Sequence, residues 1–538
     1  MRRILLVVVL ACGCDNNNSG TDPDAPPCTT DCEDAGVEPD APIAPIGAYV
    51  SVMIGDDSNM GTVDSPLATI SKGIANAMML GGDRTVIVAQ GVYNEKVALV
   101  EGIDLLGGHQ CNTTTCDWAR DITAYKSQIL NTDFEGVVAN TGITHATLLS
   151  GFTITGLPGT PTSTAGTVAL TLSGGSPTIR GNTIAGADTL ANTGPEPNNR
   201  SIGVAVRGTS DAAGVLIENN EITSGAAVQS VGVAIESTSP AVTSLVNISS
   251  NVIRSGTARR SIGVYALRAV AGSKLVNNDV TAGSSAGGPN TGIQVNSPIT
   301  VERNRVNLDR ATAGTCTQTG SWCAGIFVEG ATTTITNNVV MGPRGQRTTG
   351  LLLAELEIPA GTVTVANNYF DGGGSGPNGV SGSRNTSSAI VLLISNNMQV
   401  TLTGTVGRLG NNILSGGNNA DRFGIREDAP SGRTIHPVFV NNNFFTFSDV
   451  FGRDDAVYRE IGDSGIPFDY SSVFFFEEAS GLPAMKNGEG DPLLDSSWHV
   501  DDKSPCIDAG TATDAPATDF DGDARPAGLG VDVGHDEN

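Results

Sequence analysis

One short pattern recurs along most of this chain and constrains its fold more than any other feature. An asparagine is followed, after one residue of any kind, by an aliphatic or aromatic residue, and successive copies lie 26 to 44 residues apart. The copies begin at Asn182, Asn220, Asn251, Asn278, Asn304, Asn338, Asn368, Asn412 and Asn443. A repeat of this length indicates a solenoid, a propeller or an array of small units.

A second pattern alternates with the first: a glycine followed by two apolar residues with one residue between them. It begins at Gly203, Gly232, Gly263, Gly292, Gly325 and Gly350. The alternation of period two and the many β-branched residues predict strands. Several repeats are too short for a four-stranded propeller blade, and neither regular leucines nor a six-residue period is present. We therefore predict an all-β chain that forms a right-handed parallel β-helix.

The recurrence of asparagine has a physical reason in such a fold. Asparagine tolerates the left-handed backbone conformation of a sharp bend, and stacked side-chain amides can hydrogen-bond to one another from coil to coil. We expect the repeated asparagines to stack at one bend of the helix. In the glycine-containing strands, we expect the first and third residues after the glycine to point inward and the middle one outward.

The first 48 residues predict export rather than part of the fold. Residues 1–11 combine two arginines with a short apolar run, as in a signal peptide. The sequence Val9-Leu10-Ala11-Cys12 resembles a bacterial lipobox, which predicts lipidation of Cys12, with Cys14 as the second candidate and a plain secretory signal as the alternative. Residues 12–48 are acidic and rich in proline, and we expect a disordered tether. The expected location is the bacterial cell envelope, as an outer-membrane or cell-surface lipoprotein anchored by its lipid.

The net charge of −26 is concentrated at the two ends of the chain. Residues 449–538 hold 21 acidic and five basic residues, and this leaves residues 49–448 nearly neutral. Nucleic acid is not an expected partner, because phosphate binding needs clustered lysines and arginines. We divide the folded part into an N-terminal cap module (49–110), the β-helix repeats (111–448) and an acidic C-terminal closing segment (449–538).

A capping helix is predicted to begin at Ser65-Pro66. Its apolar face would consist of Leu67, Ile70, Ile74, Ala77 and Met78. The helix would cover the open edge of the first coil.

The remaining cysteines lie in close pairs. Local disulfides are predicted for Cys28 and Cys32, Cys111 and Cys116, and Cys316 and Cys323, with Cys506 left over. Zinc is the competing interpretation of close cysteines, but paired zinc-knuckle spacings are missing.

Both ends of the folded part resemble known proteins. At the N-terminal end the residues are Tyr49-Val-Ser51, Gly55-Asp-Asp57, Ser65-Pro-Leu67, Gly91-Val-Tyr93 and Leu105-Leu-Gly-Gly108. At the C-terminal end they are Ser504-Pro-Cys506, Ile507-Asp-Ala-Gly510, Asp519-Phe-Asp521 and Val531-Asp-Val-Gly534. These resemble secreted proteins of the pectin lyase-like superfamily and, at the C-terminus, the choice-of-anchor surface β-helix proteins. The resemblance covers residues 49–537 and implies the β-helix fold and export, but no particular activity.

No catalytic residues are assigned. The Gly-His-Gly and Arg-Ile-Lys motifs of the polygalacturonase-type members are missing, and the arginines open to a lyase-like role (Arg207, Arg268, Arg303 and Arg305) have few acidic neighbours. If one glycine-containing strand stacks per coil, Glu236 and Glu329 lie roughly 14 Å apart, beyond the spacing of two-carboxylate glycosidases. Arg207 and Glu236 are then predicted to form a salt bridge between coils. The five histidines are interpreted as loop or packing residues.

Two binding sites are predicted. The outward residues Tyr265, Gln294 and Phe327 would present two aromatic rings with an amide between them, which suits sugar rings; the alternative is that a loop covers them. Asp519, Asp521 and Asp523 could hold calcium, although an acidic glycine turn explains the same residues; no cofactor is otherwise required. The predicted function is a carbohydrate-binding or structural, adhesive scaffold with polysaccharide as partner, and the alternative is a polysaccharide lyase or glycoside hydrolase acting on acidic polysaccharide.

Overall fold

The structure is a computed structural model of the chain. It describes residues 47–538 apart from 82–83, 114–115, 160–165, 190–198, 210, 238, 240, 286–287, 309–321, 330–331, 355–362, 375–384, 394–406, 429–435, 446–454 and 462–466. The predicted signal peptide and nearly all of the tether, and with them Cys12, Cys14, Cys28 and Cys32, lie outside the described residues. Residues Ile46–Asn538 form one compact unit, and no helix in its described part has the length and hydrophobicity to cross a bilayer.

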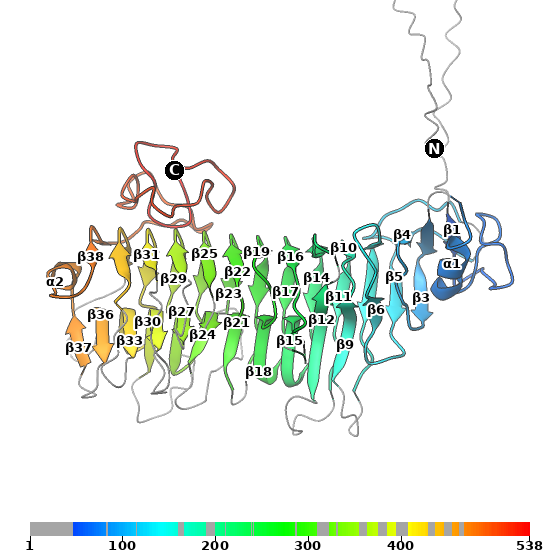
Figure 1. Ribbon diagram of the computed structural model, residues 1–538, viewed down its shortest axis with the longest axis horizontal. Helices are drawn as coiled ribbons and strands as arrows, with labels where there is room; N and C mark the ends of the chain where they lie inside the picture. Colours follow the sequence, from blue (N-terminus) through cyan, green and yellow to red (C-terminus); the bar gives the residue numbers. More distant parts are fainter. Residues whose placement is uncertain are drawn as a thin grey trace, which may run out of the picture. The chain divides into compact units, whose positions relative to one another are not determined.

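The described strands form three long sheets that together make a right-handed parallel β-helix (Figure 1). The 14-stranded sheet contains, in order, β1 (Ala48–Val50), β2 (Thr85–Ala89), β4 (Asp104–His109), β7 (Leu148–Ser150), β10 (Thr178–Arg180), β13 (Val215–Glu218), β16 (Val246–Ser249), β19 (Ser273–Val276), β22 (Ile299–Glu302), β25 (Thr333–Thr336), β28 (Thr364–Ala366), β31 (Arg408–Gly410), β34 (Val438–Val440) and β38 (Ala484–Met485). The 13-stranded sheet contains β3 (Gly91–Asn94), β5 (Ser127–Leu130), β8 (Phe152–Thr155), β11 (Thr183–Ala185), β14 (Glu221–Thr223), β17 (Val252–Arg254), β20 (Asp279–Thr281), β23 (Arg305–Asn307), β26 (Val339–Met341), β29 (Tyr369–Asp371), β32 (Ile413–Ser415), β35 (Asn443–Phe445) and β39 (Gly488–Glu489). The 12-stranded sheet contains β37 (Pro467–Tyr470), β36 (Ala456–Ile461), β33 (Asp421–Asp428), β30 (Thr386–Leu393), β27 (Arg347–Ala354), β24 (Cys323–Glu329), β21 (Asn290–Val295), β18 (Ala258–Ala266), β15 (Ala227–Ile235), β12 (Arg200–Thr209), β9 (Thr167–Gly174) and β6 (Val137–Asn140).

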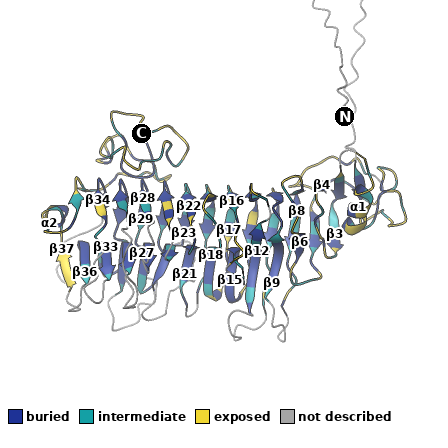
Figure 2. Cartoon of the chain, in the orientation of Figure 1, coloured by how far each residue is buried: buried dark blue, intermediate teal, exposed yellow. Residues whose placement is uncertain are grey.

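Each coil contributes one strand to each sheet, as β12, β13 and β14 do before the chain returns to the 12-stranded sheet at β15. Pairings between these strands are parallel, except that β36 pairs with β37 in the antiparallel direction. The glycine-containing strands point as predicted: Val204 and Val206 belong to the central core, whereas Ala205 belongs to a separate cluster on the outer face. The interior is therefore filled by rows of buried aliphatic side chains, and the strands that carry them are coloured mostly as buried in Figure 2.

The repeated asparagines stack at the bend between the 14-stranded and 13-stranded sheets, as predicted. The side-chain oxygen of Asn304 accepts hydrogen bonds from the backbone N–H and the side-chain amide of Asn278, at 3.0 and 2.9 Å. Its own amide donates to the carbonyls of Leu275 and Glu302 and to Asn338. We call the whole stack the inner asparagine ladder; its members are Asn182, Asn220, Asn251, Asn278, Asn304, Asn338, Asn368, Asn412, Asn442 and Asn487.

Two details of the asparagine prediction are wrong. The ladder uses Asn442, whereas Asn443 begins β35 and its amide donates to the Gly490 carbonyl. The left-handed conformation belongs to the residue before each ladder asparagine, with φ between +51° and +56° at the non-glycine positions. Those positions are Asn219, Ser250, Asn277, Arg303, Asn337, Asn367, Asn411, Asn441 and Lys486. The ladder asparagine itself makes the hydrogen bonds at the bend, and the residue before it adopts the left-handed conformation.

The N-terminal cap contains the predicted helix, but it begins later than expected. Helix α1 spans Ile70–Ala77, with Thr69 as its N-cap accepting from the Lys72 N–H. Leu67 instead pairs with Val50 as an isolated β-bridge, and its N–H donates to the Tyr49 carbonyl. The helix buries its apolar face on β1 and β2, where Gly73 lies so close to Val50 and Val86 that a Cβ would clash. The second helix, α2 (Val473–Glu477), packs Phe476 against Phe439 and Tyr458 at the other end of the core.

The predicted disulfide between Cys111 and Cys116 is present. Cys323 is also disulfide-bonded, while its predicted partner Cys316 lies outside the described residues. Cys506 is free and buried, and burial raises its thiol pKa to about 12.

The predicted closing segment divides in two: residues 456–489 still form β36 to β39 and α2 of the β-helix, and residues 490–538, to which we now restrict the name closing segment, fold back onto its outside, over the strands around β25 to β31 (Figure 1). Four left-handed asparagines, which we call the outer asparagine column (Asn337, Asn367, Asn411 and Asn441), hold its backbone. Asn411 both donates to the Thr511 carbonyl at 2.8 Å and accepts from the Thr511 N–H at 2.9 Å.

Candidate functional site

The outer face of the 12-stranded sheet carries a cavity of about 800 Å³. Its walls come from β12, β15 and β18 and the turns that follow them. The lining residues are Arg200, Arg207, Gln229, Glu236, Ser237, Ser239, Val242, Arg260, Tyr265 and Leu267. We call this cavity the arginine groove; a separate, smaller cavity of about 210 Å³ shares Arg200 and Arg207 with it and is also lined by Glu135.

Three polar residues of this groove lie in one row. Arg200 pairs in register with Gln229, and Gln229 pairs with Arg260, so adjacent strands present one polar side chain each. Neighbouring strands of a sheet lie about 4.8 Å apart, so the row repeats at that spacing. The row was not predicted, although its signal is present in the sequence: each residue stands three positions before a repeat glycine, in Arg200-Ser-Ile-Gly203, Gln229-Ser-Val-Gly232 and Arg260-Ser-Ile-Gly263.

Glu236 is bound by arginines from two places in the groove. Arg200 donates from Nη1 to Oε1 at 3.0 Å and its Nη2 lies 2.8 Å from Oε2, a two-point contact. The predicted contact between Arg207 and Glu236 is present but looser, with Nη2 and Oε1 3.8 Å apart. Among the described residues that line the larger cavity, Glu236 is the single carboxylate against three arginines, so this lining is positively charged.

The predicted row of Tyr265, Gln294 and Phe327 lies in register on the same outer face. Its members do not form the open platform that was expected. Gln294 is buried, and its side-chain oxygen accepts from Arg260 Nη2 at 2.8 Å. Phe327 is half-buried and packs against a separate cluster that includes Trp322 and Leu352.

Tyr265 is the member of that row that lines the groove. The guanidinium of Arg260 lies 5.8 Å from the centre of its ring. A cation at this distance from an aromatic face is attracted by the ring electrons and holds the ring in place. The groove therefore combines fixed cations with one half-buried aromatic ring.

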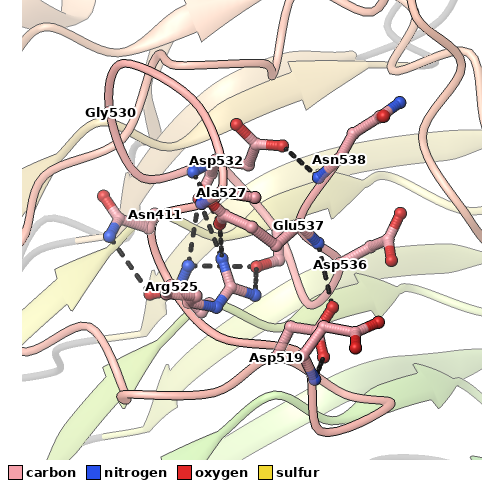
Figure 3. Close-up of polar contacts among 12 residues, drawn as sticks. Asn411, Asp519, Arg525, Ala527, Gly530, Asp532, Asp536, Glu537 and Asn538 are labelled. Atoms are coloured by element: carbon pink, nitrogen blue, oxygen red, sulfur yellow. Dashed lines mark hydrogen bonds and ion pairs between the residues drawn. The ribbon is translucent and has the colours of Figure 1, made fainter.

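The predicted calcium ligands do not come together. Asp519 is buried, and its Oδ1 accepts from the backbone N–H groups of Asp521, Gly522 and Asp523 at 2.8 to 3.0 Å. It thus forms the acidic turn that was the alternative interpretation. Figure 3 shows Asp519 beside Glu537, and its Oδ2 also accepts a hydrogen bond from the Glu537 N–H.

The structure instead brings Asp521 together with His499 and Asp536, whose ligand atoms lie within 4.8 Å of one another. The hydrogen bond to Asp536 raises the pKa of His499, and burial raises the pKa of Asp521. An imidazole with two carboxylates is a donor set typical of zinc more than of calcium, which prefers oxygen. Beside it, Arg525 and Glu537 form a buried ion pair at 2.8 Å that closes the segment (Figure 3).

No family model matches the chain, and no curated protein sequence matches it. Among solved structures it is similar to the Dettilon tailspike protein gp208, with a TM-score of 0.34 and 12% identity over 72% of this chain and 63% of the tailspike. It is also similar to XylC solved with xylose (TM-score 0.41, 12% identity, 91% of this chain and 98% of XylC) and to the GH136 lacto-N-biosidase from Eubacterium ramulus (0.29, 14%, 76% and 65%). The chain thus spans less than two thirds of the tailspike and of the lacto-N-biosidase.

Proposed function

We propose that the protein is a carbohydrate-binding β-helix protein whose groove on the 12-stranded sheet binds an acidic polysaccharide. The observation that carries this proposal is the row of Arg200, Gln229 and Arg260 beside Tyr265 in a groove with one carboxylate. Guanidinium groups bind carboxylates and sulfates in two-point contacts. The tyrosine ring offers an apolar surface to a sugar ring.

The shape of the groove suits a polymer rather than a small compact ligand. It spans the parallel strands β12, β15 and β18, and the smaller cavity lies next to it, on the other side of Arg200 and Arg207. The arginines of the row, Arg200 and Arg260, are separated by one strand, so their backbone positions lie about 10 Å apart. This is about the length of two sugar units, and alternate acidic residues of a chain could meet the two cations.

Titration calorimetry with polygalacturonate, and with neutral dextran as the contrast, tests this proposal. We expect binding of polygalacturonate that weakens with added salt, since charged contacts on an open surface are screened. Arg260→Gln should weaken binding at least tenfold. Arg254→Gln is the matched control, because Arg254 is an exposed arginine on β17 of another sheet, paired with Glu221. Equal effects of the two substitutions, or failure of polygalacturonate to bind, would contradict the proposal.

Polygalacturonate also tests the alternative of a lyase or hydrolase, when its products are analysed after incubation with the protein. A hydrolase of the two-carboxylate type needs a second acid near Glu236, and Arg200 occupies both oxygens of Glu236. The release of unsaturated products or new reducing ends from polygalacturonate would replace the binding function with an enzymatic one.

We propose further that the protein is lipid-anchored in the bacterial envelope through Cys12. This rests on the lipobox-like Val9-Leu10-Ala11-Cys12 and the acidic stretch that follows it. Labelling with a fatty-acid analogue should mark the wild type and not Cys12→Ser. Label that persists in Cys12→Ser would assign the anchor to another residue.

A cation at His499, Asp521 and Asp536 is the remaining part of the proposal. Zinc should raise the melting temperature of the wild type and leave His499→Ala unchanged, whereas calcium should raise neither. A calcium effect retained in His499→Ala would favour the aspartate turn as the site.

A further inference from the structure

A second cavity, of about 590 Å³, lies on the outer face of the 13-stranded sheet, beside the part of the C-terminal closing segment that carries Trp498. Its lining includes aromatic, charged and amide side chains: Tyr369, Phe445, Trp498, Arg344, Asp371 and Asn418. It lies on a different sheet from the arginine groove, and no predicted site residue lines it.

The register of the sheet explains why a cavity forms here. Two outward rows run side by side across β26, β29 and β32. The closing segment covers the first row, Val339, Tyr369 and Ile413, with Val500, Cys506 and Val533. The second row, which begins with Met341, Asp371 and Ser415 and ends at Phe445, forms the floor of the cavity.

Trp498 marks the rim between the two rows. Its ring lies 4.9 Å from the Tyr369 ring and is half-buried, so one part packs and another lines the cavity. Phe445 lies on the same floor, and its ring is 6.3 Å from that of Tyr369. The cavity therefore has aromatic walls supported by a third, buried ring.

The polar groups of the cavity are fixed and nearly balanced in charge. Asp371 accepts from Ser415 Oγ at 2.6 Å and from the Gly373 N–H at 2.7 Å, which orients its carboxylate. Arg344 offsets its charge, and Arg422 is paired with Asp455 at 2.9 Å. This differs from the first groove, where three arginines meet one carboxylate.

We propose that this cavity is a second saccharide site that takes a neutral hexose or pentose ring. The apolar face of the ring would pack on Trp498 and Phe445. Adjacent hydroxyls would donate to the oriented carboxylate of Asp371 and accept from Arg344, because a diol satisfies a donor and an acceptor together. The site depends on the closing segment, since that segment supplies Trp498.

Tryptophan fluorescence offers a direct test in the full chain. Trp118 and Trp322 are 4% and 7% exposed, so Trp498 is the tryptophan best placed to respond to a ligand. Cellotriose, xylotriose and maltotriose are the probes, and calorimetry measures the affinity independently. We expect at least one of them to shift the emission and to bind, and Trp498→Leu to remove the signal. Asp371→Asn should weaken that binding at least tenfold with an unchanged melting temperature.

Arg260→Gln in the first groove is the matched control and should leave neutral-sugar affinity within twofold of the wild type. Wild-type protein that binds none of the three probes, or Asp371→Asn with undiminished affinity, would overturn the second site. If the second site is overturned in this way, loss of polygalacturonate binding in Arg260→Gln would still support the arginine groove. The two proposals therefore fail by different results.

Discussion

The bend that carries the asparagines differs between the two halves of the β-helix, although its backbone does not. In the N-terminal half the left-handed residues Asn219 and Asn277 are exposed. In the C-terminal half the outer asparagine column has the same φ values but is buried beneath the closing segment. The backbone requirement alone thus explains asparagine at Asn219 and Asn277, whereas at Asn337, Asn367 and Asn411 the side chain also recognises another segment.

The inner asparagine ladder is the constant part of both halves and should tolerate change least. Asn304→Ala removes five side-chain hydrogen bonds, among them the one that the buried Asn278 N–H donates and the one to the Leu275 carbonyl. Each buried unpaired polar group costs on the order of 1–3 kcal/mol, so we expect a loss of about 4 kcal/mol. Urea unfolding followed by circular dichroism measures it. A loss below about 1 kcal/mol would mean that the ladder is a packing feature only.

Acid should destabilise the closing segment but not the inner asparagine ladder, because amides do not titrate and His535 does. Burial lowers the pKa of His535 to about 3, from its usual value of 6.5. The unfolded state then binds the additional proton between these values, so the stability contributed by His535 is complete above pH 6.5 and is lost as the pH falls. His499 has the opposite sign, since its raised pKa favours the folded state at low pH.

We expect the segment to lose about 3 kcal/mol between pH 6.5 and pH 4, at 1.4 kcal/mol per pH unit. Hydrogen exchange of residues 504–538 as a function of pH measures this. His535→Phe keeps a ring between Tyr369 and Phe520 but cannot be protonated, so its profile should be flatter. His109, whose pKa burial lowers to about 4, titrates in both proteins and serves as the internal reference. Parallel profiles would show that His535 does not control the segment.

Asn411→Gly tests the outer asparagine column itself. Glycine adopts the left-handed conformation freely, so the substitution keeps the bend and removes the reciprocal pair with Thr511. We expect a loss of about 2 kcal/mol from the two hydrogen bonds, seen as faster proteolysis within residues 504–538. Unchanged proteolysis would show that the apolar row under the segment is sufficient to hold it.

Asn277→Gly is the matched substitution in the exposed half and should have the smallest effect. The Asn277 amide reaches only Ser250 Oγ, at 3.2 Å, among the hydrogen bonds of the described residues. We expect the free energy of unfolding to change by less than about 0.5 kcal/mol, as for most exposed positions. A loss comparable to that of Asn411→Gly would remove the distinction between the two halves.

The sequence predicted the repeated ladder and strand positions, but it did not predict the contacts between residues that lie far apart in the chain. Periodicity located the ladder from Asn182 to Asn412, but the run Asn441-Asn442-Asn443 fits the pattern in more than one register, and the packing of Phe444 in the core decides it. The glycine-containing strands placed Tyr265, Gln294 and Phe327 in one row. Their burial could not be predicted, because it depends on neighbours such as Arg260 and Trp322.

The arginine groove and the second cavity were missed for different reasons. Arg200 and Arg260 do lie in a repeat, three residues before its glycine, and a longer repeat window would have found them. Trp498 lies in a segment without periodicity, and its contact with Tyr369 joins residues far apart in the sequence. No local pattern encodes such a contact.

The position of the closing segment after the strands that it covers also sets an order in which the outer surface is completed. Ribosomes make proteins from the N-terminus, so Asn337 to Asn441 emerge before the backbone of Ala509, Thr511, Thr518 and Asp532 that binds them. Until that backbone arrives, four amides and the row of Val339, Tyr369 and Ile413 stay uncovered. Exposed apolar surface is what chaperones and proteases recognise. A chain cut before this segment would therefore keep that row exposed to them.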